Sequence, residues 1–358
     1  MSATTFDLPA MTRVVTLAVR PGQQGPQPDD FRLEQQPVPE LGPGQVLVRN
    51  AYMSVDPSMR GRLEPTEKHY TTNFQVGEPL DGSAIGWVVA SNAPEIPVGA
   101  ALRHRRGWRD YAVVDARELS DAAIAAVVDP DRAPLSTWLG ILGQTGFTAY
   151  AGIVRAGQLQ RGNVVFVSAA AGAVGSAAGQ FARLLGASRV VGSAGGEAKR
   201  RLLVEELGYD DAIDYRAEEV AVGLTRTAPD GIDVYFDNVG GDHLVAALDS
   251  LRVGGRVALC GTISQFGATG SRPSIDHLIQ AVLKRLTLRG FIIRDHADLR
   301  PEFEEAVVGW LRSGELVSRE TVVDGLDSAV SAFLDMLRGG NVGKMLVRLG
   351  PDEPAGQE

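Results

Sequence analysis

Three small residues at a fixed spacing are the clearest chemical signal in the sequence. Ala170, Gly172 and Gly175 follow the apolar run "VVFVS" with the spacing of a G-x-G-x-x-G turn, and the helix-like stretch "GSAAGQFARLLG" begins at the last of them. In such a turn the second glycine lets backbone approach a pyrophosphate, and the third lets a helix pack closely on a strand. The first position mainly needs a tight turn, which alanine makes if its φ is negative. The stretch therefore predicts a dinucleotide site, with a turn that binds nothing as the alternative.

The end of the next predicted strand distinguishes between nucleotides. NAD sites usually place an acid there, about 20 residues after the turn, to hold the ribose hydroxyls. Here Gly192 and Ser193 occupy that place, and Lys199 and Arg200 follow at the start of the next helix. The missing acid and the added cations favour the 2′-phosphate of NADP(H) over NAD(H), and they count against S-adenosylmethionine. The alternative is that both basic residues are solvated positions on a helix.

Metal ligands are scarce in the sequence. A catalytic zinc site needs about three Cys, His or acidic ligands, and a structural site about four. The chain has one cysteine, Cys260, and five histidines that form no ligand-spaced cluster. We therefore expect no metal, and without a Lewis acid the protein has little means of polarising an alcohol for oxidation. Cys260 ends an apolar run, so packing is favoured over a role as a catalytic thiol.

Two textures along the chain indicate the elements that must position these residues. Residues 1–142 contain short β-segments separated by Gly and Pro, which indicates a compact, mostly antiparallel β domain. Residues 143–299 alternate strands and helices, which indicates a parallel sheet with right-handed crossovers, that is, an α/β doubly wound fold. Residues 300–358 are predicted to return to the first domain, because six strands already complete the parallel sheet. The six predicted strands span 163–168, 189–193, 211–215, 232–239, 255–261 and 286–293.

Composition limits the class of protein. The chain has 358 residues, enough for two domains, and its net charge of -9 disfavours nonspecific binding to nucleic acid. The start of the chain lacks the pattern of a signal peptide, and no apolar run approaches the roughly 18 residues of a membrane span. A single cysteine suits a reducing cytosol. We expect a cytoplasmic protein with a small-molecule ligand.

Several stretches together resemble a known family. They are "AYMSVDPSMRGR", "GEPLDGSAIGWVV", "GWRDYAVV", "GQTGFTAYAGI", "AAAGAVGSAAGQ", "FDNVGG", "CGTIS" and "GNVGKMLV". In this order they are similar to the zinc-independent medium-chain dehydrogenase/reductases, and most to the NADPH-dependent double-bond reductases of alkenals, prostaglandins and leukotriene B4. The resemblance covers residues 12–349. It implies a Rossmann domain, a GroES-like β domain, an active site in the cleft between them, and a homodimer that joins sheets edge to edge near "LTLRGFII".

The resemblance also implies roles for single residues. Lys199 and Tyr215 match residues that hold the adenosine 2′-phosphate, and Asn238 and Asn341 match further cofactor contacts. The remaining matched cofactor positions are Gly172, Ala173, Val174, Gly175, Ser176, Ser193, Cys260, Phe291, Ile292 and Ile293. Each has a structural alternative, such as a strand cap for Tyr215 or a core position for Phe291.

The implied reaction is conjugate reduction, in which hydride passes from C4 of NADPH to the β-carbon of an enone or enal. The chain departs from the family at two positions of the substrate pocket. Phe266 stands where relatives often have a tyrosine that hydrogen-bonds the substrate carbonyl, and Ser58 stands where they commonly have a tyrosine. The enolate oxygen would then be met by the nicotinamide ribose, by water, or by Tyr52 or Tyr70, both of which also suit packing roles. Two alternatives stay open: a quinone reductase, and an NADPH-binding protein with little catalysis.

Overall fold

The computed structural model describes residues 9–64, 71–122, 125–263 and 277–354. The chain divides into two compact units. The first unit consists of Met1–Leu139, Thr321–Asn341 and Met345–Glu358, and the second consists of Gly140–Glu320 and Val342–Lys344. Each unit has its own sheet and its own core, so each is described separately.

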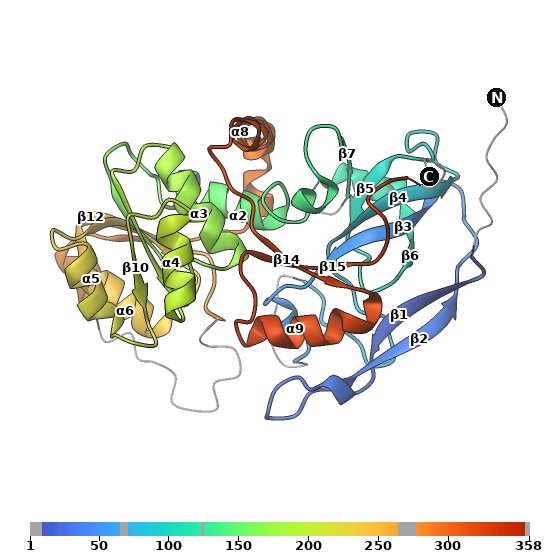
Figure 1. Cartoon of the computed structure of the whole chain (residues 1–358), viewed down its shortest axis with the longest axis horizontal. Coiled ribbons are helices and arrows are strands. Elements are labelled where there is room, and N and C mark those ends of the chain that lie inside the picture. The colour runs from blue at the N-terminus through green and yellow to red at the C-terminus, as the bar shows by residue number, and fades with distance from the viewer. Residues whose placement is uncertain (1–8, 65–70, 123–124, 264–276, 355–358) are drawn as a thin grey trace. The chain divides into compact units, whose positions relative to one another are not determined.

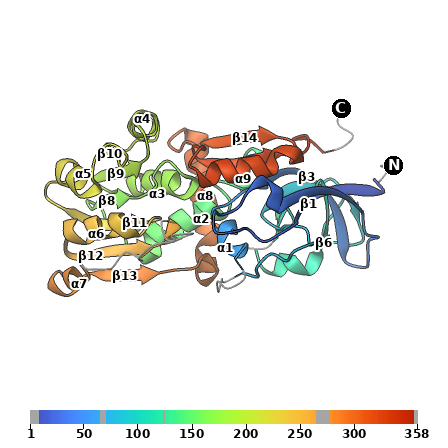
Figure 2. The ribbon, with the colours of Figure 1, turned by 90° about the horizontal axis from the view of Figure 1, so that it is seen from below.

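Six parallel strands form the sheet of the second unit, in the order β10-β9-β8-β11-β12-β13 (Figure 2). Numbered along the chain this order is 3-2-1-4-5-6, that of a doubly wound dinucleotide-binding domain. The strands are β8 (Val164–Val167), β9 (Arg189–Ala194), β10 (Asp211–Asp214), β11 (Ile232–Asp237), β12 (Leu251–Leu259) and β13 (Thr287–Gly290). The predicted α/β fold class is confirmed, and the predicted strands overlap the observed ones.

Helices cover both faces of this sheet (Figure 1). On one face α5 and α6 bury Leu224 and Leu248 against Phe166, Tyr235 and Val257 of the strands. The apolar strands have few polar positions because a parallel sheet is buried on both faces. The helices of this unit are α2 (Gln144–Ala151), α3 (Ala173–Leu184), α4 (Glu197–Glu205), α5 (Val220–Thr227), α6 (Gly241–Ser250), α7 (Ile279–Leu283) and α8 (Arg300–Ser313).

Helix α8 belongs to the second unit, whereas the sequence places the return to the first domain at residue 300. The reason is aromatic packing. Phe303 of α8 is fully buried, with its ring centroid 5.2 Å from that of Phe147 and 5.6 Å from that of Tyr150, both on α2. The hydroxyl of Tyr150 also donates a hydrogen bond of 2.6 Å to Glu302. The return to the first unit therefore begins at Thr321.

The last parallel strand is shorter than predicted. It pairs with β12 only as far as Gly290, opposite Leu259, and the chain then leaves the sheet. Phe291 packs instead on Gly152 and Phe236, so closely that a Cβ on Gly152 would lie 2.7 Å from the ring of Phe291. The strand expected over 286–293 is therefore too long, because Phe291 is used for packing rather than for strand pairing.

The first unit contains an antiparallel sheet with the order β14-β15-β3-β4-β5-β7, to which β6 adds by pairing with β3. Strands β1 and β2 pair with each other in a separate two-stranded sheet. Strand β2 was not predicted, because its polar sequence "FRLEQQP" leaves most of its residues exposed. The elements are β1 (Met11–Leu17), β2 (Phe31–Pro37), β3 (Gln45–Ser54), α1 (Met59–Arg62), β4 (Ala84–Ser91), β5 (Ala101–His104), β6 (Tyr111–Asp115), β7 (Ala126–Val128), β14 (Glu320–Asp324), α9 (Ala329–Leu337) and β15 (Lys344–Arg348).

Charged and aromatic residues of the first-unit motifs hold one another. The buried Arg62 makes a two-pronged ion pair with Asp81, with distances of 2.5 and 2.6 Å, and its guanidinium lies 3.9 Å from the ring centre of Phe74. Trp108 is fully buried beside Phe333. The stretches "SVDPSMRGR", "PLDGSAIGWVV" and "GWRDYAVV" all contribute residues to one core cluster of this unit, among them Met59, Leu80 and Trp108.

Candidate active site

The turn between β8 and α3 has the geometry of a phosphate-binding loop. The left-handed residue of the turn is Ala169, with φ of 48°, whereas Ala170 does not have a positive φ. Ala170 is fully buried and its N–H donates to the carbonyl of Ser193 at 2.8 Å. Alanine is therefore accepted at the first motif position because its neighbour supplies the left-handed conformation.

The two glycines of the turn differ in what surrounds them. A Cβ on Gly175 would lie 2.3 Å from the carbonyl oxygen of Ala169 and 2.7 Å from the Cα of Ala170. A Cβ on Gly172 would meet only the Ala169 oxygen, at 3.3 Å. Gly175 therefore permits close packing of helix and strand, while Gly172 leaves room in front of the N-terminus of α3. This cradle fits the pyrophosphate of a dinucleotide.

A polar network joins the carboxyl ends of β8 and β11, the strands at which the strand order reverses. The N–H of Asn238 donates to the hydroxyl of Ser168 at 2.9 Å, and its side-chain amide donates to the Ser168 carbonyl at 2.7 Å. The buried carboxylate of Asp237 accepts from the hydroxyl of Tyr235 at 2.7 Å and from the N–H of Gly240 at 2.7 Å. Ligands of open α/β sheets bind at such a switch point. The sequence did not point to Ser168 or Asp237 as site residues. The available signal was their position, because Ser168 directly follows the apolar strand β8 and Asp237 is the last residue of β11.

Residues expected near a 2′-phosphate gather after β9 and β10. Ser193 is fully buried, Lys199 lies in the first turn of α4, and Tyr215 follows β10 with 44% of its surface exposed. The hydroxyl of Tyr215 reaches back over Gly195, where it would lie 2.7 Å from a Cβ. The carboxylate of Asp214 accepts from the N–H of Gly196 at 2.8 Å, which ties the two loops together. The structure thus brings these predicted residues into one unit, at or just after the ends of the adjacent strands β9 and β10.

Arg200 was expected to offer a positive charge to the nucleotide, but in the structure it is paired with a carboxylate. Its guanidinium forms a two-pronged pair with Glu197, with distances of 2.6 and 2.7 Å. Each partner is one helical turn from the other, so the pair is formed within α4. The positive charge of Arg200 is thereby largely compensated.

Several buried polar atoms at this end of the sheet have no partner among the described residues. They are the hydroxyl of Ser193, Oδ2 of Asp237 and Nε2 of His243. Buried polar groups in proteins nearly always have a hydrogen-bond partner. Their presence here fits a site that a polar ligand completes.

The other predicted cofactor residues lie at different places. Cys260 follows β12, and its N–H donates to the carbonyl of Asp237 at 2.9 Å. Burial, together with the nearby Asp237, raises the pKa of the Cys260 thiol to about 12, so it is not a thiolate at neutral pH. Ile292 is exposed, and Ile293 is half-buried. Asn341 belongs to the first unit, whereas Gly343 belongs to the second and its N–H donates to the carbonyl of Ala171 at 2.8 Å.

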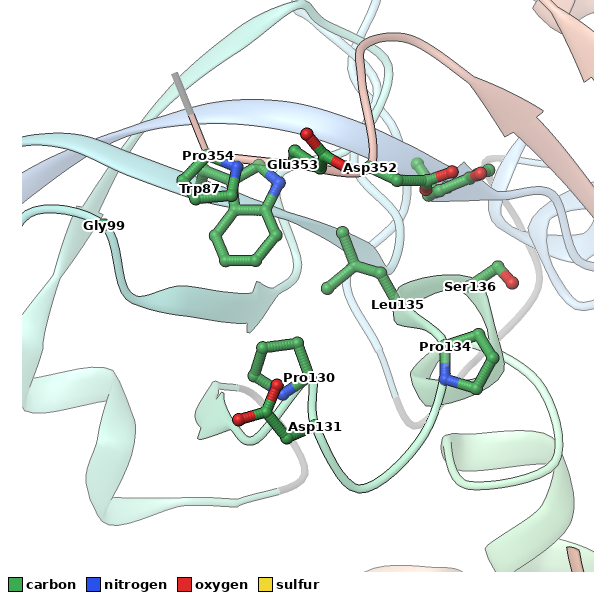
Figure 3. Close-up of a pocket in the computed structure, with 11 residues that line it drawn as sticks. Trp87, Gly99, Pro130, Asp131, Pro134, Leu135, Ser136, Asp352, Glu353 and Pro354 are labelled. Atoms are coloured by element: carbon green, nitrogen blue, oxygen red, sulfur yellow. The ribbon is translucent and has the colours of Figure 1, made fainter. Parts of the chain in front are cut away.

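Tyr52 lines a pocket of about 560 Å³ in the first unit (Figure 3). Burial and a hydrogen bond with Asp352 raise the pKa of its hydroxyl to about 12. Asp131 and Glu353 add two more carboxylates to the pocket wall. Such a wall would repel an enolate, so this pocket is unsuited to stabilise one. The other lining residues are Trp87, Gly99, Pro130, Pro134, Leu135, Ser136 and Pro354.

The other residues predicted for the substrate side are Ser58, Tyr70 and Phe266. Ser58 is exposed at the start of α1, and its side chain makes no capping hydrogen bond there. Tyr70 and Phe266 lie outside the described residues. Within the described ranges, no group of three or more His, Cys, Asp or Glu residues could hold a metal ion. No helix in those ranges has the length and hydrophobicity that crossing a membrane requires.

Comparison with known proteins agrees with this architecture. A family model described as the N-terminal domain of oxidoreductase matches residues 13–122, and one described as zinc-binding dehydrogenase matches residues 173–312. A 2-alkenal reductase (NADP(+)-dependent) from Nicotiana tabacum is 39% identical over 87% of this chain and 88% of its own length. An NADPH-dependent curcumin reductase from Escherichia coli is 38% identical over 94% of this chain and 96% of its own length.

A solved structure agrees as well. The crystal structure of CurA from Vibrio vulnificus in complex with NADPH superimposes with a TM-score of 0.87 at 37% identity, covering 95% of this chain and 99% of that one. Quinone oxidoreductases of known structure, such as that of Pseudomonas syringae, share the fold at 21% identity. The chain therefore belongs to the medium-chain dehydrogenase/reductase family of oxidoreductases, in the zinc-independent branch of the alkenal and curcumin reductases.

Proposed function

We propose that this protein uses NADPH to reduce the carbon–carbon double bond of α,β-unsaturated aldehydes and ketones. The observation that carries the proposal is the glycine turn at Gly172, open in front of α3 and followed by a strand end that lacks an acid. Relatives of 38–39% identity that reduce alkenals or curcumin support the substrate class. A relative named (+)-pulegone reductase, from Mentha piperita, is 36% identical over 87% of this chain and extends that support to a cyclic enone.

The cofactor site is assigned to the second unit. The backbone from Gly172 to Ser176 binds the pyrophosphate at the start of α3, where unpaired N–H groups and the helix dipole favour an anion. Lys199 and Tyr215 bind the adenosine 2′-phosphate. Asn238 offers its side-chain oxygen, since its amide nitrogen is already engaged with Ser168. The further second-unit contacts in the proposal are Ser193, Cys260, Phe291, Ile292 and Ile293. Asn341, which belongs to the first unit, is also proposed as a cofactor contact.

The chemistry divides between the cofactor and the chain. NADPH supplies the hydride that adds to the β-carbon of the substrate. The chain must orient the unsaturated carbonyl, exclude water and stabilise the enolate oxygen until a proton reaches the α-carbon. The hydroxyl of Tyr52 is engaged with Asp352, which weakens its candidacy as the enolate donor. Ser58 and Phe266 are assigned to the substrate pocket, and Tyr70 stays a candidate donor.

We also propose a homodimer in the cytoplasm. Strand β13 is the edge of the second-unit sheet, and an uncovered edge can pair with another chain. Apolar side chains are exposed next to it on α7, with 70% exposure for Val282 and 60% for Leu283. Pairing of two β13 edges would cover both features. Light scattering would test this, since a Val282→Asp variant should then shift toward the monomer, and a wild-type monomer would refute the dimer.

The experiment for the function follows NADPH absorbance with three acceptors side by side: a trans-2-alkenal, a long-chain enone and a small quinone. We expect NADPH oxidation with the enal or the enone and much slower oxidation of NADH. Turnover confined to the quinone would contradict the proposal and identify a quinone reductase. Tight NADPH binding with all acceptors inert would instead identify a binding protein.

A further inference from the structure

The loops around Gly195 hold a second cation that the proposed 2′-phosphate site does not yet include. A Cβ on Gly195 would lie 2.7 Å from the hydroxyl of Tyr215 and 2.8 Å from Nε of Arg216. The phenol and the guanidinium therefore converge on one point above the same glycine. Gly195 stands in the loop between β9 and α4, where the ribose end of a dinucleotide binds in this fold.

The charge of Arg216 is available, unlike that of its neighbours on α4. In the part of the chain that the structure describes, the guanidinium of Arg216 has no ion pair and no hydrogen bond. The residue's one hydrogen bond there is donated by its backbone N–H to Asp214 at 3.0 Å. Arg200 is paired with Glu197 at 2.6 Å, and Arg201 lies 3.8 Å from the same carboxylate. An arginine presents several N–H donors in one plane, which suits a phosphate dianion. An arginine without a carboxylate partner suits it better than one whose charge is already partly compensated.

The position of Tyr215 is fixed from its other side. The ring of His243, on α6, meets it edge to face at a centroid distance of 5.5 Å. His243 is mostly buried, so it holds the phenol in place from within the unit. The backbone N–H of Arg216 and that of Gly196 share the carboxylate of Asp214 as acceptor, which fixes both loops relative to each other.

From this geometry we infer that Arg216 is a specificity-determining residue that grips the adenosine 2′-phosphate together with Tyr215. The inference rests on the proposed function, because it needs NADP(H) as the cofactor of this unit. Arg216, not Arg200, then supplies the arginine charge that separates NADPH from NADH. Gly195 is required because any side chain there would displace both groups.

Isothermal titration calorimetry tests this with 2′,5′-ADP and 5′-AMP, two fragments that differ by the 2′-phosphate and need no turnover. Wild-type protein should bind 2′,5′-ADP far more tightly than 5′-AMP. Arg216→Ala should weaken 2′,5′-ADP binding about tenfold, since a charge-assisted hydrogen bond is lost, and should leave 5′-AMP unchanged. Arg216→Lys should retain part of the affinity, and Gly195→Ala should lose it as well.

Arg201→Ala is the matched control, since it removes the same charge from an exposed site of the same unit. It should change 2′,5′-ADP binding less than about twofold. If wild type prefers 2′,5′-ADP but Arg216→Ala behaves like Arg201→Ala, the inference is overturned while the proposed cofactor stands. If wild type does not distinguish the two fragments, the proposed cofactor and the inference both fail.

Discussion

The glycine turn of the second unit and the motif segments of the first unit both match family patterns, but they differ in which polar groups are left without a partner. In the first unit the motif residues Arg62 and Asp81 are already paired with each other. Around the turn and the neighbouring strand ends, Ser193, Asp237 and His243 each keep a buried polar atom without a partner in the described structure. In the first unit, Trp87 and Trp108 of the motif segments also bury an indole N–H without a partner in the described structure. What distinguishes the second unit is that its unsatisfied atoms include a hydroxyl and a carboxylate oxygen at the carboxyl ends of the parallel strands, where ligands of this fold bind.

The two glycines of the turn give the sharpest test of that distinction. Gly175→Ala places a Cβ 2.3 Å from a backbone oxygen, which rigid backbone cannot avoid. We expect a loss of about 3 kcal/mol in the free energy of unfolding and loss of NADPH binding by more than about 100-fold. Urea denaturation and NADPH fluorescence titration measure the two effects.

Gly172→Ala is the control for this variant, since its Cβ meets one oxygen at 3.3 Å. It should keep the free energy of unfolding within about 1 kcal/mol of wild type, because the added methyl faces open space, and it should still weaken NADPH about tenfold. Equal destabilisation by the two variants would contradict the division of roles.

The ion pair of the first unit should affect stability without affecting the nucleotide. Arg62→Ala leaves the half-exposed Asp81 without its partner, so we expect a loss of about 2 kcal/mol in the free energy of unfolding. Arg117→Ala, in the exposed pair with Asp115, should leave the free energy of unfolding nearly unchanged. Binding of 2′,5′-ADP should stay within about twofold of wild type in both variants, and a large change in either would show that the two regions are not separable.

The buried histidine of the first unit predicts a pH dependence of stability. Burial, together with the positive charges of Arg106, Arg109 and Arg103, lowers the pKa of His104 to about 3. The pKa of a histidine in the unfolded chain is about 6.5. The unfolded chain therefore binds more protons between these values, and the free energy of unfolding falls as the pH drops from 6.5 toward 3. This group contributes a slope of up to about 1.4 kcal/mol per pH unit.

His104→Gln keeps a side-chain donor toward Asn50 and cannot titrate. Chemical denaturation from pH 7 to pH 4 should show a shallower loss of stability for the variant than for wild type. Parallel curves would mean that His104 is not neutral in the native protein.

The last prediction concerns the nucleotide preference. Lys199→Ala should raise the dissociation constant for NADPH about tenfold and leave that for NADH nearly unchanged, since NADPH alone carries the 2′-phosphate. Lys199→Arg should retain the preference. Equal weakening of both cofactors would show that Lys199 acts through the structure of α4.

The sequence predicts the parallel sheet well because burial on both faces makes its strands continuous apolar runs, such as "VVFV" and "VYF". It fails at β2, whose side chains are mostly exposed, and at Phe291, which packs on Gly152 after β13 ends. The glycine turn was predictable from local spacing. Arg216 and His243 were not, because their approach to Tyr215 depends on loops that only the folded sheet brings together.

The central claim is hydride delivery to the β-carbon of an unsaturated carbonyl, and isotope transfer tests it most directly. NADPH deuterated at C4 would be incubated with the protein and an enone, and the product analysed by NMR. The account predicts a saturated ketone with deuterium at the β-carbon, in amounts that match the NADPH consumed. Deuterium at the carbonyl carbon of an allylic alcohol, or NADPH consumption with a quinone alone, would contradict it.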